Sequence, residues 1–186
     1  MLFFMLLPGI GPDKLDRSIA EAFAWLYEEF VPKVFRYVSY RVGDIHLAED
    51  LTSAVFEKAL ARFKSYDPQK AGFSTWIFSI ARNALIDHFR VSSRRPTLNL
   101  DSLAEVGDGN PSPEDAFVRA EERRKLRACI ARLPLPEQEI ISLKFGAEMT
   151  NRQIAGLLGL TESNVGVIVY RSVRKLRDGF GEQEHD

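Results

Sequence analysis

Cysteine and histidine are scarce in this chain. Its 186 residues include one cysteine, Cys129, and three histidines. A single thiol excludes an intramolecular disulfide, so we expect a reducing, cytoplasmic setting. Too few of these four side chains have the spacing that a zinc site of the Cys/His type needs. The sequence therefore predicts no bound metal and no cofactor.

Long hydrophobic runs are lacking as well. The amino end reads "MLFFMLLPGIGP", and its apolar run from Met1 to Leu7 is far shorter than the ~20 residues that span a bilayer. It also lacks the basic leader and the small-residue cleavage site of a secretory signal. We therefore predict no membrane span, and a disordered tail or mis-assigned start over residues 1–12.

Alternating, strand-like runs are absent, and apolar residues recur at helical spacing instead. They do so from Ile19 through Val42, from Leu47 through Phe63 and from Trp76 through Phe89. Pro32 is expected to divide the first segment into two helices or to kink it. Asp44 is placed to cap the next helix. The sequence therefore predicts an all-α fold.

Proline, glycine and acidic residues mark the connections. "KSYDPQKAG" predicts a loop before the third helix, and Ser92 to Pro113 has the composition of a flexible linker. Helices resume near Glu114 and run to Leu133, and Pro136 suits the first turn of another helix. We therefore predict two small helical domains joined by a flexible linker. The predicted division is a tail over 1–12, a first domain over 13–95, an acidic linker over 96–117, a second domain over 118–178 and an acidic tail over 179–186.

The net charge of −1 hides two basic blocks. Residues 58–95 hold 8 basic and 2 acidic residues, and residues 119–177 hold 12 basic and 6 acidic ones. Residues 101–117, between them, hold five acidic residues and no basic one. This is the charge pattern of a protein that touches a polyanion at two places, although each block alone also fits a solvated surface.

The most specific local pattern is "TNRQIAGLLGLTESNVGVIVYRSVRKLR". Thr150 and Gln153 have the spacing of a capping box, Gly159 suits a sharp turn, and Thr161 can cap the helix that follows. Such a pair of helices joined by a short turn is a helix-turn-helix. The helix after the turn buries one face and offers the other, which carries Ser163, Asn164, Val167, Tyr170, Arg171, Arg174 and Lys175.

That face predicts binding to duplex DNA. In a recognition helix the amino-terminal residues meet base edges in the major groove, and basic residues further along meet phosphates. The alternative is an αα-hairpin whose basic stripe is only solvated. The agreement of cap, turn glycine and basic face favours the DNA-binding interpretation.

The sequence of the first domain narrows the range of possible functions. "HLAEDLTSAVFEKALARFKSYDPQKAGFSTWIFSIARNALIDHFR", followed after the linker by "LPLPEQEIISLKF" and the helix-turn-helix, resembles the extracytoplasmic-function (ECF) sigma factors of bacterial RNA polymerase. The resemblance covers roughly residues 15–178. It implies a non-enzymatic factor that binds the β′ clamp helices and β flap of core polymerase and directs promoter-specific initiation. It further implies binding to promoter DNA that is duplex at the −35 element and melted at the −10 element. It also suggests an anti-sigma factor as a further partner.

The resemblance assigns sites residue by residue. It implies polymerase contacts at Glu49, Asp50, Leu51, Val55 and Phe56, although Leu51 and Val55 also fit a core-facing stripe. It implies −10 contacts at Tyr66, Phe73, Trp76, Arg82, Asn83, Asp87 and Arg90.

The residues of the third predicted helix support the assignment of −10 contacts. Trp76, Asn83, Asp87 and Arg90 form one helical stripe, and their polar groups suit base edges and phosphates. Tyr66 and Phe73 could stack on unpaired bases. Trp76 fits core packing as well as DNA contact, and both interpretations stay open.

Two other functional classes predict different features. A stand-alone helix-turn-helix regulator would bind duplex DNA without polymerase. An enzyme is not predicted, because the chain has no glycine-rich phosphate loop, no Ser/His/Asp constellation and no metal-spaced carboxylates. The chain departs from the family at Gly166 and Ile168, where lysine and arginine are common, and at Val167, so the −35 sequence that it reads is not predicted.

Overall fold

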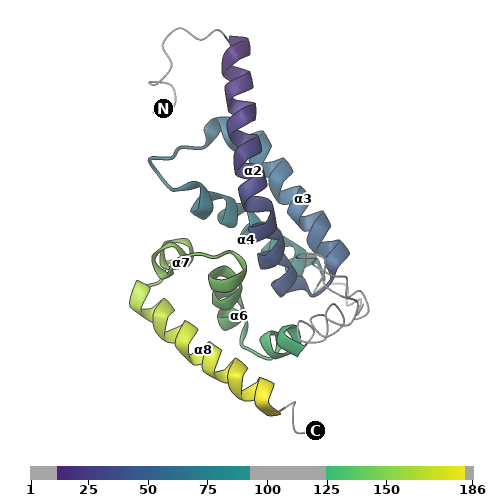
Figure 1. The fold of residues 1–186 in the computed structure, drawn as a ribbon, viewed down its shortest axis with the longest axis vertical. Coiled ribbons are helices and arrows are strands. Elements are labelled where there is room, and N and C mark those ends of the chain that lie inside the picture. The colour runs from purple at the N-terminus through teal and green to yellow at the C-terminus, as the bar shows by residue number, and fades with distance from the viewer. Residues whose placement is uncertain (1–11, 93–124, 183–186) are drawn as a thin grey trace, which may run out of the picture.

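The computed structural model describes residues 12–92 and 125–182, and within these ranges every regular element is helical (Figure 1). The first group is α2 (Pro12–Val42), α3 (Ile45–Arg62), the 3₁₀ turn η1 (Phe63–Ser65) and α4 (Phe73–Ser92). The second group is a helical stretch over 125–131, α6 (Leu135–Ile141), the π-helical turn η2 (Ser142–Gly146), α7 (Asn151–Leu158) and α8 (Glu162–Glu182).

The all-α prediction is confirmed, and the helices fall into the two predicted groups. Most of the predicted amino-terminal tail, the whole acidic linker and the last residues of the acidic tail lie outside the described ranges. The exact domain boundaries stay predictions. No helix in the described part of the chain combines the length and the apolarity needed to cross a bilayer.

Helix α2 runs unbroken past Pro32, so the predicted division into two helices is wrong. Proline costs a helix one N–H, which leaves the carbonyl of Glu28 without its usual donor. Pro32 lies on the exposed side of α2, where water can donate to that carbonyl instead. The helix therefore continues because its proline faces solvent.

Helix α3 begins where the sequence predicts. The carboxylate of Asp44 accepts a hydrogen bond from the backbone N–H of Leu47 at 3.0 Å, as predicted for an N-cap. Gly43 has a φ of 73°, a left-handed conformation that glycine adopts without strain. This glycine ends α2 and lets the chain reverse into α3.

Helices α2, α3 and α4 enclose the main hydrophobic core. Its fully buried side chains include Val34 and Tyr37 from α2, Val55 from α3, and Ile77 and Phe78 from α4. The rings of Tyr37 and Phe78 pack edge to face, with centroids 5.6 Å apart. These contacts fix the faces that α3 and α4 leave to solvent.

This core extends into the second group of helices. Leu143, Met149, Ile154 and Val165 are buried in the same cluster as the first-group residues. Helix α2 packs against η2, and α4 packs against α7. A smaller cluster around Ile130 and its neighbours Leu133 and Ile141 holds the second group together internally. The two groups therefore share one continuous apolar core, which the sequence did not predict.

We expect Phe78→Ala to lower the free energy of unfolding by about 3–5 kcal/mol, because it removes a fully buried aromatic side chain and leaves a cavity. Urea denaturation followed by circular dichroism measures this. The control is Ile86→Ala on the same helix, at a half-exposed position, where a change of about 0.5 kcal/mol is expected. Equal losses in the two variants would contradict this core.

Candidate nucleic-acid and polymerase interface

The helix-turn-helix forms as its sequence predicts. The N–H of Gln153 donates to Thr150 Oγ1 at 3.2 Å, and the N–H of Thr150 donates to Gln153 Oε1 at 2.8 Å, which completes the capping box. Gly159 ends α7 with a φ of 69°. The N–H of Asn164 donates to Thr161 Oγ1 at 3.2 Å and caps α8. Caps and turn together set the angle at which α8 leaves α7.

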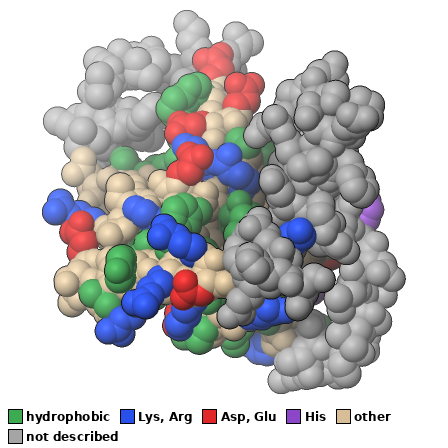
Figure 2. All heavy atoms as spheres, turned by 60° about the horizontal axis from the view of Figure 1, so that its bottom comes forward, with side chains coloured by type: hydrophobic (Ala, Val, Ile, Leu, Met, Phe, Trp, Pro, Cys, Tyr) green, Lys and Arg blue, Asp and Glu red, His purple; other side chains and the backbone are tan. Residues whose placement is uncertain are grey.

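Helix α8 has one buried and one exposed face. Val165 and Ser172 are fully buried on the inner face. On the outer face Tyr170 is 70% exposed, and Figure 2 shows Lys and Arg side chains gathered on the side of the molecule that α8 crosses. All seven predicted −35 residues are exposed: Ser163, Asn164, Val167, Tyr170, Arg171, Arg174 and Lys175. The structure thus brings the predicted set together on one accessible surface.

One member of this set already has an internal partner. Lys175 Nζ lies 2.7 and 2.9 Å from the two carboxylate oxygens of Glu137 on α6, and Ser172 Oγ donates to the same carboxylate at 3.0 Å. The hydrogen bond from Lys175, helped by Ser172 and by the charge of Arg171, holds the pKa of Glu137 below its usual value. This ion pair joins α6 to α8 beside the exposed face.

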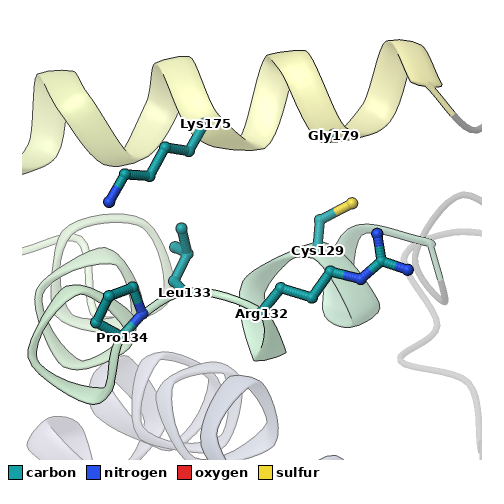
Figure 3. A pocket seen from close by; sticks show the side chains of 6 residues that line it. All are labelled: Cys129, Arg132, Leu133, Pro134, Lys175 and Gly179. Atoms are coloured by element: carbon teal, nitrogen blue, oxygen red, sulfur yellow. The ribbon is translucent and has the colours of Figure 1, made fainter.

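A pocket lies between α8 and the segment that leads into α6 (Figure 3). It is lined by Cys129, Arg132, Leu133, Pro134, Lys175 and Gly179. A β-carbon at Gly179 would lie 3.8 Å from the sulfur of Cys129, an ordinary van der Waals distance, so this glycine is not required by the packing at the pocket. Nowhere in the described ranges do three or more His, Cys, Asp or Glu side chains gather as a metal would need.

An aromatic cluster supports the loop before α4. The ring of Tyr66 stacks on Phe63 with centroids 6.1 Å apart and lies 4.9 Å from Trp76. Its hydroxyl donates to the carbonyl of Ala71 at 3.0 Å and closes the loop. Phe73 is only 9% exposed inside this cluster, so in this structure it offers no free face for a base. Trp76 is half-buried against the core, which favours the packing interpretation of that residue.

The polar stripe of α4 is exposed as predicted. Asn83, Asp87 and Arg90 all face solvent, and Arg90 Nη2 donates to Asp87 Oδ1 at 3.1 Å. Arg82 lies beside this stripe but turns toward the second group, where its Nε is 3.6 Å from Glu139 Oε1. The structure therefore keeps three of the predicted polar residues on one surface and directs Arg82 elsewhere.

The predicted polymerase-binding residues of α3 fall into two sets. Glu49 and Asp50 are exposed and Leu51 is half-buried. Val55 is fully buried, and Phe56 packs edge to face on Tyr27 with centroids 4.8 Å apart. In this structure Val55 and Phe56 therefore hold α3 on the core and leave the outer surface to the acidic pair.

Known proteins are similar in sequence to both groups of helices. Residues 26–95 match the family model for sigma-70 region 2, and residues 123–176 match the one for sigma-70 region 4. ECF RNA polymerase sigma factor RpoE of Cereibacter sphaeroides is 31% identical over 87% of this chain and 88% of its own length. The chain belongs to the ECF RNA polymerase sigma factors. The sigma factor BldN of Streptomyces coelicolor is 34% identical over 88% of this chain, which spans 62% of the length of BldN.

A solved structure supports the fold of this sigma factor. The sigma factor RpoE of Bartonella quintana, solved with the anti-sigma factor NepR, superimposes with a TM-score of 0.69. The match covers 87% of this chain and 98% of the other, at 18% sequence identity. The likeness at this identity concerns the fold. From here on, region 2 means the first group of helices and region 4 the second.

The contact between the two regions centres on residues that the sequence did not single out. The Tyr37 hydroxyl donates a hydrogen bond to Glu139 Oε1 at 2.7 Å, and Arg41 Nη2 lies 3.4 Å from Glu139 Oε2. Burial, and then the nearby Glu139 carboxylate, raise the pKa of Tyr37 well above its ordinary value, so the hydroxyl keeps its proton. No local sequence pattern marks Glu139, because it looks like any glutamate on an amphipathic helix.

We expect Glu137→Gln to destabilise this sigma factor by about 0.5–1 kcal/mol at pH 7, the range for a partly exposed ion pair. Because the folded-state pKa of Glu137 is lowered, its contribution is present above the usual carboxyl pKa and is lost as the pH falls through the folded value. The gap between variant and wild type should therefore shrink from pH 7 to pH 3. Urea titrations at both pH values measure it, and a gap that is constant with pH would contradict the assignment.

Proposed function

We propose that this sigma factor binds core RNA polymerase and directs promoter-specific initiation, with region 4 on duplex −35 DNA and region 2 on the melted −10 element. The observation that carries the proposal is the exposed outer face of α8 in a correctly capped helix-turn-helix. Small and amide side chains, Ser163 and Asn164, stand at its start, and Arg171 and Arg174 follow. This order matches a helix that reads base edges first and meets phosphates further along.

The −10 element is proposed to lie along α4 and the loop before it. Asn83, Asp87 and Arg90 offer an amide, a carboxylate and a guanidinium group on one exposed stripe, which suits contacts to bases and phosphates. Tyr66, half-exposed at the edge of the aromatic cluster, is the ring best placed to stack on an unpaired base. Phe73 and Trp76 support that ring from behind.

Core polymerase is proposed to meet region 2 on the outer surface of α3, where Glu49 and Asp50 are exposed, and to meet region 4 at the β flap. The sigma factor of Bartonella quintana was solved with an anti-sigma factor, and we propose a partner of that class for this chain too. The proposal assigns no catalytic step to the sigma factor. Its work would take place with polymerase in the bacterial cytoplasm.

Run-off transcription with purified core polymerase on a pool of genomic fragments tests the proposal. New discrete transcripts that share two upstream motifs, and that need this protein, are the expected result. The competing regulator hypothesis expects no new transcripts, together with retention of duplex fragments by the protein alone. That second result would overturn the sigma-factor proposal.

We expect Arg171→Ala to lower the affinity for a −35 duplex by about 1–3 kcal/mol if Arg171 reads a base with two hydrogen bonds, and to relax the sequence preference at that position. A phosphate contact would instead weaken matched and mismatched duplexes alike. Filter binding of the polymerase complex to both duplexes separates the two cases. The control is Arg152→Ala on α7, an exposed arginine paired with Glu162, for which we expect little change. Unchanged binding in Arg171→Ala would remove this residue from the interface.

A further inference from the structure

Val167 lies near the middle of the outer face of α8. At about 100° per residue it points away from Val165 and Ser172, which are both fully buried. Val167 is 44% exposed, and Figure 1 shows α8 along an edge of the molecule. Its neighbours one turn before and one turn after, Ser163 and Arg171, are exposed and polar. Exposed valines are common in proteins, so the position of Val167 on this face matters more than its exposure.

Packing does not explain Val167 or the glycine before it. Both residues lower the stability of a helix relative to alanine, because valine loses side-chain freedom and glycine loses backbone freedom. A β-carbon at Gly166 would meet only Nδ2 of Asn151, at an ordinary distance of 3.5 Å. Alanine would therefore fit at both positions and would favour the helix more. Residues that break a local rule in this way, without a gain in packing, are expected at functional sites.

A valine on a DNA-reading face can recognise only one kind of feature on a base pair. Its side chain neither donates nor accepts a hydrogen bond, whereas most groups on the major-groove edges of the bases do. Against such a group it would displace water without replacing the lost hydrogen bond, which costs free energy. The 5-methyl group of thymine is the apolar feature of that edge. The side chain of Val167 therefore selects for thymine.

The neighbours of Val167 allow this short side chain to reach a base. Its methyl groups are attached directly to Cβ, so the helix backbone must come close to the base edges. Gly166 and Ser163 are small, and they lie in the amino-terminal part of α8, which a recognition helix places against the base edges. Glycine in particular permits a close approach of backbone to a ligand. The long side chains of Arg171 and Arg174 come later in the helix.

We propose that Val167 is a specificity-determining residue, which reads the 5-methyl group of a thymine in the −35 element. The inference rests on the proposed function, because it needs α8 in the major groove of duplex DNA. The four residues from Val167 to Arg171 rise about 6 Å along the helix, which is close to two base-pair steps of about 3.4 Å. The thymine should therefore lie within about two base pairs of the group that Arg171 contacts.

Removal of single methyl groups from the DNA tests this directly. Duplexes that the complex of this sigma factor with core polymerase selects from a random pool give the −35 sequence. Each thymine of that sequence, on either strand, is then replaced in turn by uracil, which differs only in lacking the 5-methyl group. We expect one replacement to weaken binding about fourfold, the effect of one buried methyl-sized group, and the others to have smaller effects. A −35 sequence in which no thymine methyl matters would overturn the proposal.

The variant Val167→Ala shows whether the valine reads that methyl group. We expect it to bind the thymine duplex several-fold more weakly than the wild type, with its preference for thymine over uracil reduced to less than about twofold. The control Val91→Ala makes the same change at a 60% exposed position on α4 and should keep the full preference. Circular dichroism checks that both variants retain their helices. An undiminished preference in Val167→Ala would overturn the proposal, because another side chain would then read the methyl group.

A second variant separates a loss of specificity from general damage to α8. Val167→Ser places a hydroxyl group on the same face, and a hydroxyl group can pair with donors and acceptors alike. We expect this variant to bind all four base pairs at the thymine position with similar affinity and to keep the wild-type preferences at the other positions. A uniform loss of affinity and of preference at every position would overturn the specific role of Val167.

The results also distinguish this inference from the proposed function. Selected duplexes and run-off transcripts that need the sigma factor, but that are insensitive to every thymine methyl group, would overturn the role of Val167 and leave the function in place. If the polymerase complex selected no duplex and gave no transcripts, the proposed function would fail and the role of Val167 would fail with it.

Discussion

The hydrogen bond from Tyr37 to Glu139 is the contact on which the arrangement of the whole molecule depends. Tyr37 is fully buried, its ring packs against Phe78 in the core of region 2, and its backbone lies against Gly146 of region 4. A buried hydroxyl is costly unless it donates, and here its acceptor is supplied by the other region. Tyr37 therefore belongs to the core of region 2 and also helps to hold region 4 in its position.

Much of the fold could be predicted from the sequence because it is set by local chemistry. Asp44, the pair Thr150 and Gln153, and Thr161 cap helices through side-chain oxygens within three residues, and Gly159 turns the chain with a conformation that other residues avoid. These interactions do not depend on distant contacts. Pro32 shows the limit of the same reasoning, because the local rule predicts a break and only its exposed position on α2 lets the helix continue.

The candidate site was predictable in part. A helical stripe correctly separated the exposed residues Asn83, Asp87 and Arg90 from the core, but it could not tell a buried aromatic ring from an accessible one at the edge of a stripe. Phe73 and Phe56 are both buried in the structure. The pairing of Arg82 with Glu139 links residues 57 positions apart in different regions. Periodicity carries no information about such a contact, which depends on how two finished surfaces meet.

The pairing of Lys175 with Glu137 has a consequence for how ions in solution affect promoter binding. A cation that neutralises a phosphate releases counterions from DNA, and each such contact steepens the fall of log K with log salt by about 0.9. Lys175 brings its own carboxylate partner, so as long as that pair persists it displaces no counterion from the duplex. In the proposed binding mode, region 4 would release fewer ions from DNA than its count of basic residues suggests. The affinity proposed for a −35 element would then vary correspondingly little with cellular ionic strength.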